Sequence, residues 1–397
     1  MRTTASRRLF VTLCVPLAVG TTLPISIPAP PAQAQDYACA RPAHLQLDRN
    51  TPPELDPSVA ASRSHASGRG VRVAVIDTGI ARHPQLPPVT PGRDFVTPDD
   101  PDPFFDCDSH GTIVAGIIAS RDLGIAPTAH LISIRQTSAH YREEQAAGSL
   151  ATLTDAINNA VDERARVINI SIVSCMPPYL AASLNTHELE AALHRAETSG
   201  AVVVAAAGNA TNECAHGFAV FPAHMPTVLA VGAREDAHTV ADYSIASPKP
   251  PLSARGTTPV VLASDGAGFA TGITGELQPD GTPTVQPYVG TSFAAPVVSG
   301  AIALLFERYP HLSPQQVREI VYAAAEPNGG ALRPEDIVTQ LPPTPPREAT
   351  VTTIDAPLPT ASLAARRAGL ALGGLLACIA LTIVARSLRG GRGRRGL

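Results

Sequence analysis

Tryptophan is absent from this 397-residue chain, and aromatic residues make up only 4% of it. Proteins that bind single-stranded nucleic acid usually stack bases on aromatic side chains, so this composition argues against that class. Lysine is almost absent too, because Lys249 is the only one and the other basic residues are arginine. Hydrophobic residues reach 44% and charged residues 16%, a balance that excludes a disordered chain and allows a sizeable core.

Acidic residues are missing from both ends of the chain. Residues 1–34 and 366–397 together hold ten arginines and no Asp or Glu, so the body between them carries 20 basic residues against 34 acidic ones. An acidic body argues against DNA or RNA as a partner, because phosphate binding needs clustered Lys and Arg. Basic ends beside apolar runs are typical of segments that meet a membrane.

Residues 1–34 have the features of a secretory signal peptide. Three arginines precede an apolar stretch at 9–27, and Ala32-Gln33-Ala34 matches an A-x-A cleavage site. We expect cleavage after Ala34. The alternative, an uncleaved N-terminal anchor, is disfavoured by the prolines that crowd the end of the apolar stretch.

A second apolar segment, 368–385, predicts one transmembrane helix. It contains no charged residue and would span roughly 27 Å at about 1.5 Å per residue, enough for a bilayer. Two arginines precede it and five follow in the tail, 386–397, so the tail should be cytoplasmic and the body extracytoplasmic. This predicts a single-pass type I protein of the cytoplasmic membrane. Residues 327–367 are proline-rich and should form an extended linker.

The cysteine pattern agrees with secretion. One of the six cysteines lies in the signal peptide and one in the predicted span, which leaves an even number in the body. In an oxidising compartment these should form two disulfides, with three possible pairings. No C-x-x-C spacing occurs, so a zinc site is a poor alternative. The four body cysteines are Cys39, Cys107, Cys175 and Cys214.

The body has the pattern of an α/β domain. Its apolar runs are nearly continuous rather than alternating, which is typical of parallel strands buried on both faces. Amphipathic helical patterns lie between them, so we expect a doubly wound parallel sheet with helices on both faces and a site at the carboxyl ends of the strands. The predicted strands are 72–76, 131–134, 167–172, 201–206 and 228–231, and the clearest helices are 149–163 and 186–197.

Three short motifs carry residues suited to nucleophilic catalysis. Asp77-Thr78-Gly79 follows a predicted strand, His110-Gly111-Thr112 opens an apolar helix, and Ser292 lies in the block Gly290–Pro296 before another helix. Each alone is ambiguous; an aspartic protease, for example, needs two Asp-Thr-Gly carboxylates. Together they supply a nucleophile, a base with a near-neutral pKa, and a carboxylate that orients the base. We therefore predict Asp77, His110 and Ser292 as a catalytic triad.

A fourth motif predicts an oxyanion hole. Asn209 follows the strand at 201–206, where its side-chain N–H could donate to a developing negative charge. The backbone N–H of Ser292, at the start of a helix, would be the second donor.

These four motifs resemble the subtilisin family of serine proteases, in which Asp, His and Ser follow one another in this order. With the strand Ser133–Thr137, the signal peptide, the proline-rich linker and the single span, the chain is more narrowly similar to the mycosins, membrane-anchored subtilisins of actinobacterial type VII secretion. The resemblance implies a protease domain at 71–326, a serine endopeptidase activity, no cofactor and no metal. It also implies secreted proteins as substrates and type VII membrane components as partners.

The resemblance leaves other functions open. The main alternative is a structural component that stabilises the secretion complex, with proteolysis secondary. A cell-wall hydrolase is a weaker alternative, because no motif in the sequence supports it. Residues 35–70 are too short for a chaperone-like prodomain of subtilisin type, and we expect an extension that remains and wraps over the body.

The expected substrate-binding residues are Ser171, Ile172, Val173 and Gly208. Ile172-Val173 replaces a Leu-Gly that is usual in subtilisins, which should narrow the first specificity pocket. The acidic residues between Asp99 and Asp106 are interrupted by proline, and we expect a solvated loop there rather than a calcium site.

The disulfide pairing can be predicted from the strand order. Cys175 and Cys214 each follow one of two successive predicted strands, whose carboxyl ends should be neighbours. We therefore pair Cys175 with Cys214, which leaves Cys39 for Cys107. The alternative pairings, or free buried cysteines, would contradict this argument.

Overall fold

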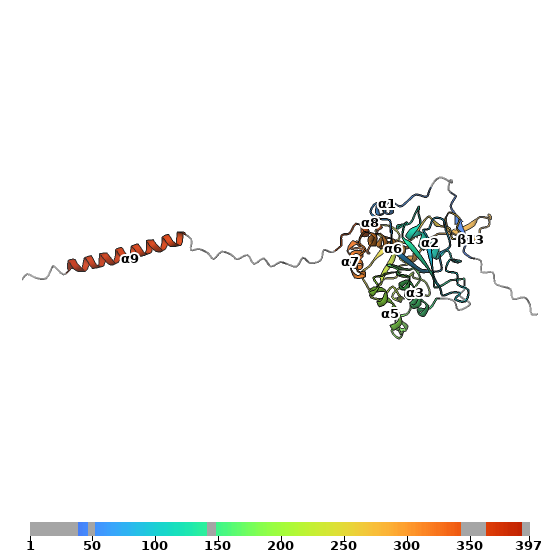
Figure 1. Ribbon diagram of the computed structural model, residues 1–397, viewed down its shortest axis with the longest axis horizontal. Helices are drawn as coiled ribbons and strands as arrows, with labels where there is room; N and C mark the ends of the chain where they lie inside the picture. Colours follow the sequence, from blue (N-terminus) through green and yellow to red (C-terminus); the bar gives the residue numbers. More distant parts are fainter. Residues whose placement is uncertain (1–38, 47–51, 141–147, 343–362, 391–397) are drawn as a thin grey trace, which may run out of the picture. The chain divides into compact units, whose positions relative to one another are not determined.

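The computed structural model describes residues 39–46, 52–140, 148–342 and 363–390, in two units that divide after Pro342 (Figure 1). The predicted signal peptide lies outside the described residues, as do most of the predicted linker and the end of the basic tail.

A seven-stranded sheet forms the centre of the body. Its strands follow the order β10-β9-β7-β5-β2-β4-β3, and every neighbouring pair is parallel. The central strands are buried on both faces, which explains their continuous apolar runs. The bounds are β2 Arg72–Asp77, β3 Val89–Asp94, β4 His130–Arg135, β5 Val167–Ile170, β7 Val202–Ala206, β9 Leu229–Arg234 and β10 Ser253–Arg255.

Helices cover both faces of this sheet (Figure 1). α2 (His110–Ala119) and α6 (Thr291–Arg308) pack against each other in one core cluster. α3 (Leu150–Asp162) and α5 (His187–Thr198) pack together in a second cluster on the opposite face. The predicted doubly wound α/β fold is confirmed.

The strand order places a topological switch beside β2. From β2 the chain proceeds to β3 and β4 on one side, and then crosses to β5 on the other side of β2. Connections that diverge in this way open a crevice at the carboxyl ends of the strands, where doubly wound proteins bind ligands. Asp77 ends β2 and Ser171 follows β5, so both lie at this crevice.

Several short elements were not predicted from the sequence. Like β3 and β10 of the main sheet, most of them are short and have few apolar positions. The exception is the helix Pro314–Ala324, in which the buried Val317, Ile320 and Val321 have helical spacing. The other strands are β1 Pro42–His44, β6 Ser174–Met176, β8 Ala219–Phe221, β11 Thr257–Thr258, β12 Val261–Leu262, β13 Phe269–Leu277, β14 Pro283–Gln286 and β15 Tyr288–Val289; the helices are α1 Pro57–Arg63, α4 Pro178–Ala181, α7 Pro314–Ala324 and α8 Pro334–Val338.

The described parts of the N-terminal extension lie on the body. β1 adds to β13 as an antiparallel strand, and α1 contacts α8 and α6. The Glu307 carboxylate accepts three backbone N–H groups, those of Ser67, Gly68 and Arg69, at 2.6–3.0 Å. The extension is therefore held by backbone bonds at several points rather than by a core of its own.

Both predicted disulfide pairings are confirmed. Cys39 is bonded to Cys107, with their Cα atoms 4.5 Å apart, and Cys175 to Cys214, at 5.6 Å. β5 and β7 are indeed neighbours in the sheet, and β6 pairs with β8 beside the second bridge. The first bridge ties the extension to the loop that precedes His110.

The boundary predicted at residue 327 between body and linker is wrong. α8, which follows that boundary, belongs to the body, and Leu332, Ile337 and Val338 are buried. The folded unit therefore continues to Pro342. Proline misled the prediction here, because Pro334 occupies the first turn of α8, where its missing N–H costs no hydrogen bond.

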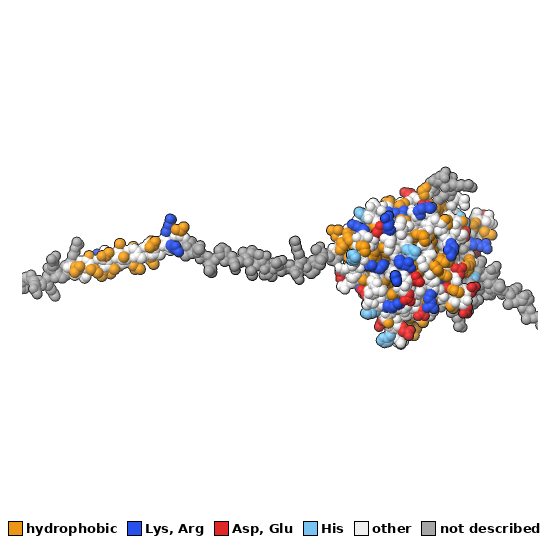
Figure 2. All heavy atoms as spheres, in the orientation of Figure 1, with side chains coloured by type: hydrophobic (Ala, Val, Ile, Leu, Met, Phe, Trp, Pro, Cys, Tyr) orange, Lys and Arg blue, Asp and Glu red, His pale blue; other side chains and the backbone are white. Residues whose placement is uncertain are grey.

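The second unit is one helix, α9 (Leu363–Gly390). A candidate membrane span within it covers 26 residues, Leu363–Leu388, and its most apolar 18-residue stretch has a mean hydropathy of 2.3. This includes the predicted span 368–385 and extends beyond it at both ends, because the flanking arginines do not interrupt the helix. Figure 2 shows apolar side chains along the helix and basic ones at its beginning, where long arginines can reach the polar surface of a bilayer.

Candidate active site

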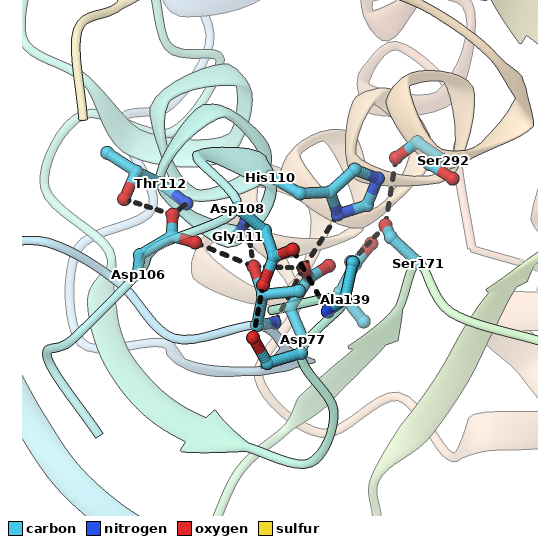
Figure 3. A network of polar contacts seen from close by, with 12 residues as sticks. Asp77, Asp106, Asp108, His110, Gly111, Thr112, Ala139, Ser171 and Ser292 are labelled. Atoms are coloured by element: carbon cyan, nitrogen blue, oxygen red, sulfur yellow. Dashed lines mark hydrogen bonds and ion pairs between the residues drawn. The ribbon is translucent and has the colours of Figure 1, made fainter. Parts of the chain in front are cut away.

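Asp77 and His110 form a close pair at the carboxyl edge of the sheet (Figure 3). The Asp77 carboxylate is fully buried, and its Oδ1 lies 2.6 Å from His110 Nδ1. The same oxygen accepts the backbone N–H of Thr78 at 2.8 Å. With Nδ1 held by the carboxylate, the other ring nitrogen of His110 is free to act as a base.

Glycine at position 111 permits this close approach. A Cβ on Gly111 would lie 2.0 Å from the carbonyl oxygen of Gly79, which is impossible without moving backbone. Gly79 itself has a φ of +110°, a conformation that favours glycine. The two glycines let the start of α2 pack directly on the turn that follows β2.

The surroundings of His110 favour its charged form. Burial alone lowers the pKa of His110, but the charge and hydrogen bond of Asp77, with smaller contributions from Asp106 and Asp108, outweigh burial. The pKa of His110 is therefore raised above its ordinary value. This stabilises the imidazolium that forms when the histidine takes a proton.

Asp106 corrects one expectation from the sequence. It belongs to the acidic stretch expected to be solvated, yet it is 9% exposed and lies behind the Asp77–His110 pair. Its carboxylate accepts the Thr78 hydroxyl at 2.7 Å, and the backbone N–H and hydroxyl of Thr112 at 2.8 and 2.6 Å. Burial raises the pKa of Asp106 to about 6, although these hydrogen bonds oppose the shift.

Ser292 lies in the first turn of α6, where the sequence explains an unusual contact. Pro296 has no N–H to donate to the Ser292 carbonyl four residues earlier in the helix. The hydroxyl of Ser171 donates to that carbonyl instead, at 2.8 Å. Ser171 is in turn held by Asn169, which also accepts the Ser299 hydroxyl, so a buried network joins β5 to α6.

Ser292 and His110 line the same cavity, and Figure 3 shows the imidazole between Asp77 and Ser292. In the part of the chain that the structure describes, no hydrogen bond joins the Ser292 hydroxyl to the imidazole. Such bonds are often long in free enzymes and shorten when substrate binds.

Asn209, the predicted oxyanion donor, is bonded to the residue before Ser292. Its Oδ1 accepts both the backbone N–H and the hydroxyl of Thr291 at 3.0 Å. The side-chain amide hydrogens of Asn209 therefore remain for another acceptor. The backbone N–H groups of the first turn of α6 have no partner within the helix, so Ser292 offers a second donor nearby.

The cavity has a volume of about 420 Å³. Of the predicted substrate-binding residues, Ser171, Ile172 and Val173 line it. Gly208 does not line it: Gly208 is buried, and its N–H donates to the Thr291 hydroxyl at 3.2 Å. Residues that the sequence analysis did not assign also line it, among them Asp108, Gln136, Leu150 and Leu153.

The family model of the subtilase family (Peptidase_S8) matches residues 68–345. The chain belongs to the subtilase family. Mycosin-4 of Mycobacterium tuberculosis is 38% identical over 65% of this chain and 60% of its own length, and Mycosin-1 of the same organism is 32% identical over 77% of this chain and 74% of its own. The resemblance to mycosins is thereby confirmed.

Comparison with solved structures agrees with the sequence similarity to mycosins. One chain in the structure of an intact ESX-5 inner membrane complex matches with a TM-score of 0.65 and 29% identity. The match covers 89% of this subtilase and 94% of that chain. The alignment with Mycosin-4 spans less than two thirds of that relative's length.

Proposed function

We propose that this subtilase is a membrane-anchored serine endopeptidase that processes proteins secreted by a type VII system. The observation that carries the proposal is the Asp77–His110 bond of 2.6 Å at the cavity that Ser292 also lines. His110 and Ser292 thus meet at one opening, the buried Asp77 is bonded to His110, and Asn209 is bonded to Thr291 at the start of α6. The disulfides fit a body outside the cytoplasm.

The proposed chemistry follows from this arrangement. His110 Nε2 takes the proton of the Ser292 hydroxyl as the oxygen attacks the substrate carbonyl. The oxyanion accepts the Asn209 amide N–H and the Ser292 backbone N–H. His110 then gives the proton to the leaving amine, and water releases the acyl group by the same steps. Asp77 stabilises the imidazolium throughout.

Turnover of denatured protein by the full chain in detergent tests the proposal. Ser292→Ala should abolish cleavage. Asn209→Ala should lower kcat about 100- to 1000-fold, the range found for this donor in subtilisin. Asn185→Ala, which removes an exposed amide that is not among the residues lining the cavity, is the matched control. Cleavage by Ser292→Ala at the wild-type rate would contradict the proposal.

The proposal also assigns roles to the segments before and after the protease domain. Residues 1–34 would be removed as a signal peptide, residues 35–70 would remain as an extension, and α9 would anchor the body outside the membrane with residues 386–397 in the cytoplasm. The apolar composition of α9 and the excess of arginine after it support this orientation.

A structural role is the second candidate. The similarity to a chain of the ESX-5 inner membrane complex favours association with type VII membrane components, and a scaffold would need the fold but not the triad. Replacing the gene with one that encodes the Ser292→Ala variant, and then measuring both substrate processing and secretion, separates the two roles. Loss of processing with secretion intact would assign the structural role to the fold and the processing to Ser292.

A further inference from the structure

The hydroxyl of Thr78 connects the Asp77–His110 pair to a second buried carboxylate, that of Asp106. The hydroxyl oxygen lies 3.2 Å from Asp77 Oδ1 and 2.7 Å from Asp106 Oδ1. The same oxygen accepts the backbone N–H of Gly111 at 2.9 Å. A hydroxyl has one hydrogen to donate, so the two carboxylates compete for it. The shorter distance assigns the hydrogen to Asp106 when both carboxylates are charged.

The other oxygen of the Asp106 carboxylate already has two donors. Oδ2 accepts the backbone N–H and the hydroxyl of Thr112, at 2.8 and 2.6 Å (Figure 3). The Thr112 hydroxyl oxygen accepts the backbone N–H of Ala81 at 2.8 Å, so its own hydrogen points to Asp106. Two donors occupy both lone pairs of Oδ2. A proton that binds to Asp106 therefore belongs on Oδ1, the oxygen that faces Thr78.

A proton on Asp106 changes the direction of the Thr78 hydroxyl. The protonated Oδ1 donates to the Thr78 oxygen, because Gly111 occupies only one of its two lone pairs. The Thr78 hydrogen then turns to Asp77 Oδ1. Asp77 gains a donor and attracts the imidazolium of His110 less strongly, so His110 becomes a weaker base. Loss of the negative charge of Asp106 acts in the same direction.

We propose that Asp106 is a positioning residue that sets the base strength of His110 through the hydroxyl of Thr78. The inference rests on the proposed endopeptidase function and adds a regulatory group to the same site. Asp77, Thr78 and Asp106 are all buried, where hydrogen bonds to charged groups are strengthened. The titratable groups that interact with Asp106 are Asp77 at the end of β2, His110 of α2 and Tyr288 of β15.

The two protonations should oppose each other. Burial raises the pKa of Asp106 to about 6, so Asp106 binds its proton in the range where His110 also titrates. A proton on Asp106 makes His110 harder to protonate, which keeps part of the base neutral as pH falls. The acid limb, over which the rate rises with pH, should therefore be shallower than the roughly tenfold per pH unit of a single group.

Covalent labelling tests this inference, because it reports on the base without a known substrate. The full chain in detergent is treated with a fluorophosphonate, and the rate constant for modification of Ser292 is measured from about pH 5 to about pH 9. In Asp106→Asn the amide can donate to Thr78 as a protonated carboxyl would. We expect the acid limb of this variant to move to lower pH by on the order of one unit and to have the slope of a single group.

Asp108→Asn is the matched control for charge. Asp108 also favours the charged form of His110, but its carboxylate is bonded to Ser138 and Ala139 rather than to Thr78. Because Asp108 lines the cavity, any displacement of the limb in Asp108→Asn should shrink as salt is raised. The displacement in Asp106→Asn should persist, because a buried group is screened little by salt.

Variants of Thr78 test the route through the hydroxyl. Thr78→Ser keeps the hydroxyl and should keep the limb of the wild type. Thr78→Val removes the hydroxyl but leaves the charge of Asp106, so adding Asp106→Asn to it should move the limb much less than in the wild type. Circular dichroism shows whether each variant is folded, and the slope of the wild-type limb requires no variant.

The outcomes are distinct. A wild-type limb with the slope of a single group, or a limb at the same pH in wild type and Asp106→Asn, overturns this inference and leaves the endopeptidase in place. A displacement as large with Thr78→Val as without it also overturns it. If the folded wild type takes no label on Ser292, the proposed function fails, and this inference fails with it.

Discussion

The residues of the proposed catalytic triad should depend on one another. Asp77 holds His110, and a base at His110 would have no function without the proposed nucleophile Ser292. We expect Asp77→Asn to lower kcat/KM by several orders of magnitude, and double replacements within the triad to add little to the loss from one. Steady-state kinetics of the single and double variants checks this. Near-full activity in Asp77→Asn would refute the assignment.

The pH dependence of activity should reflect the raised pKa of His110. The base must be neutral to accept a proton, so kcat/KM should rise with pH along a limb whose apparent pKa lies above 6.5. In any residual activity of Asp77→Asn, that limb should move to lower pH, because the partner that favours the imidazolium is neutral. A limb that stays in place would show that another group titrates.

Asp106 makes a separate prediction about stability. Its folded-state pKa of about 6 is higher than the ordinary value of 3.8, so the folded protein binds the proton more tightly than the unfolded chain. The contribution of Asp106 to stability should therefore increase as pH falls from about 7 to about 4, by on the order of 3 kcal/mol. Denaturant unfolding of wild type and Asp106→Asn across this range measures it; a constant difference between the two would contradict it.

The N-terminal extension is attached by a disulfide to the loop that precedes His110. The Cys39–Cys107 bridge closes a separation of 68 residues, and the Ala40 N–H donates to the Cys107 carbonyl at 2.8 Å. Reduction should expose residues 39–70 to proteolysis before the body unfolds, with a loss of about 4 kcal/mol by chain-entropy reasoning. Cys39→Ser should behave alike. Equal resistance of the reduced and oxidised extension would contradict this.

Some of the strands and helices could be predicted from the sequence, and others could not. The buried parallel strands and the helices between them were predictable because long apolar runs have a recognisable period. The pairing of β1 with β13 was not, because three residues carry no period and the partner lies more than 200 residues away. Asp106 escaped notice for a similar reason: its burial depends on Thr78 and Thr112, which only the folded chain brings to it.

For the whole molecule, the testable property is its orientation in the membrane. We expect protease added to intact protoplasts to remove the body and to leave an epitope after Arg386 protected, because five arginines follow the span and two precede it. Permeabilised protoplasts provide the control, in which the epitope is lost. Protection of the body and loss of the tail epitope would reverse the proposed topology.

The central claim is that Ser292 is a nucleophile activated by His110, and covalent labelling tests it most directly. A fluorophosphonate probe reacts with an activated serine, and peptide mapping locates the modified residue. Our account predicts a single label on Ser292, lost in Ser292→Ala and strongly reduced in His110→Ala. A folded wild-type protein that takes no label, or takes it elsewhere while Ser292 remains free, would contradict the account.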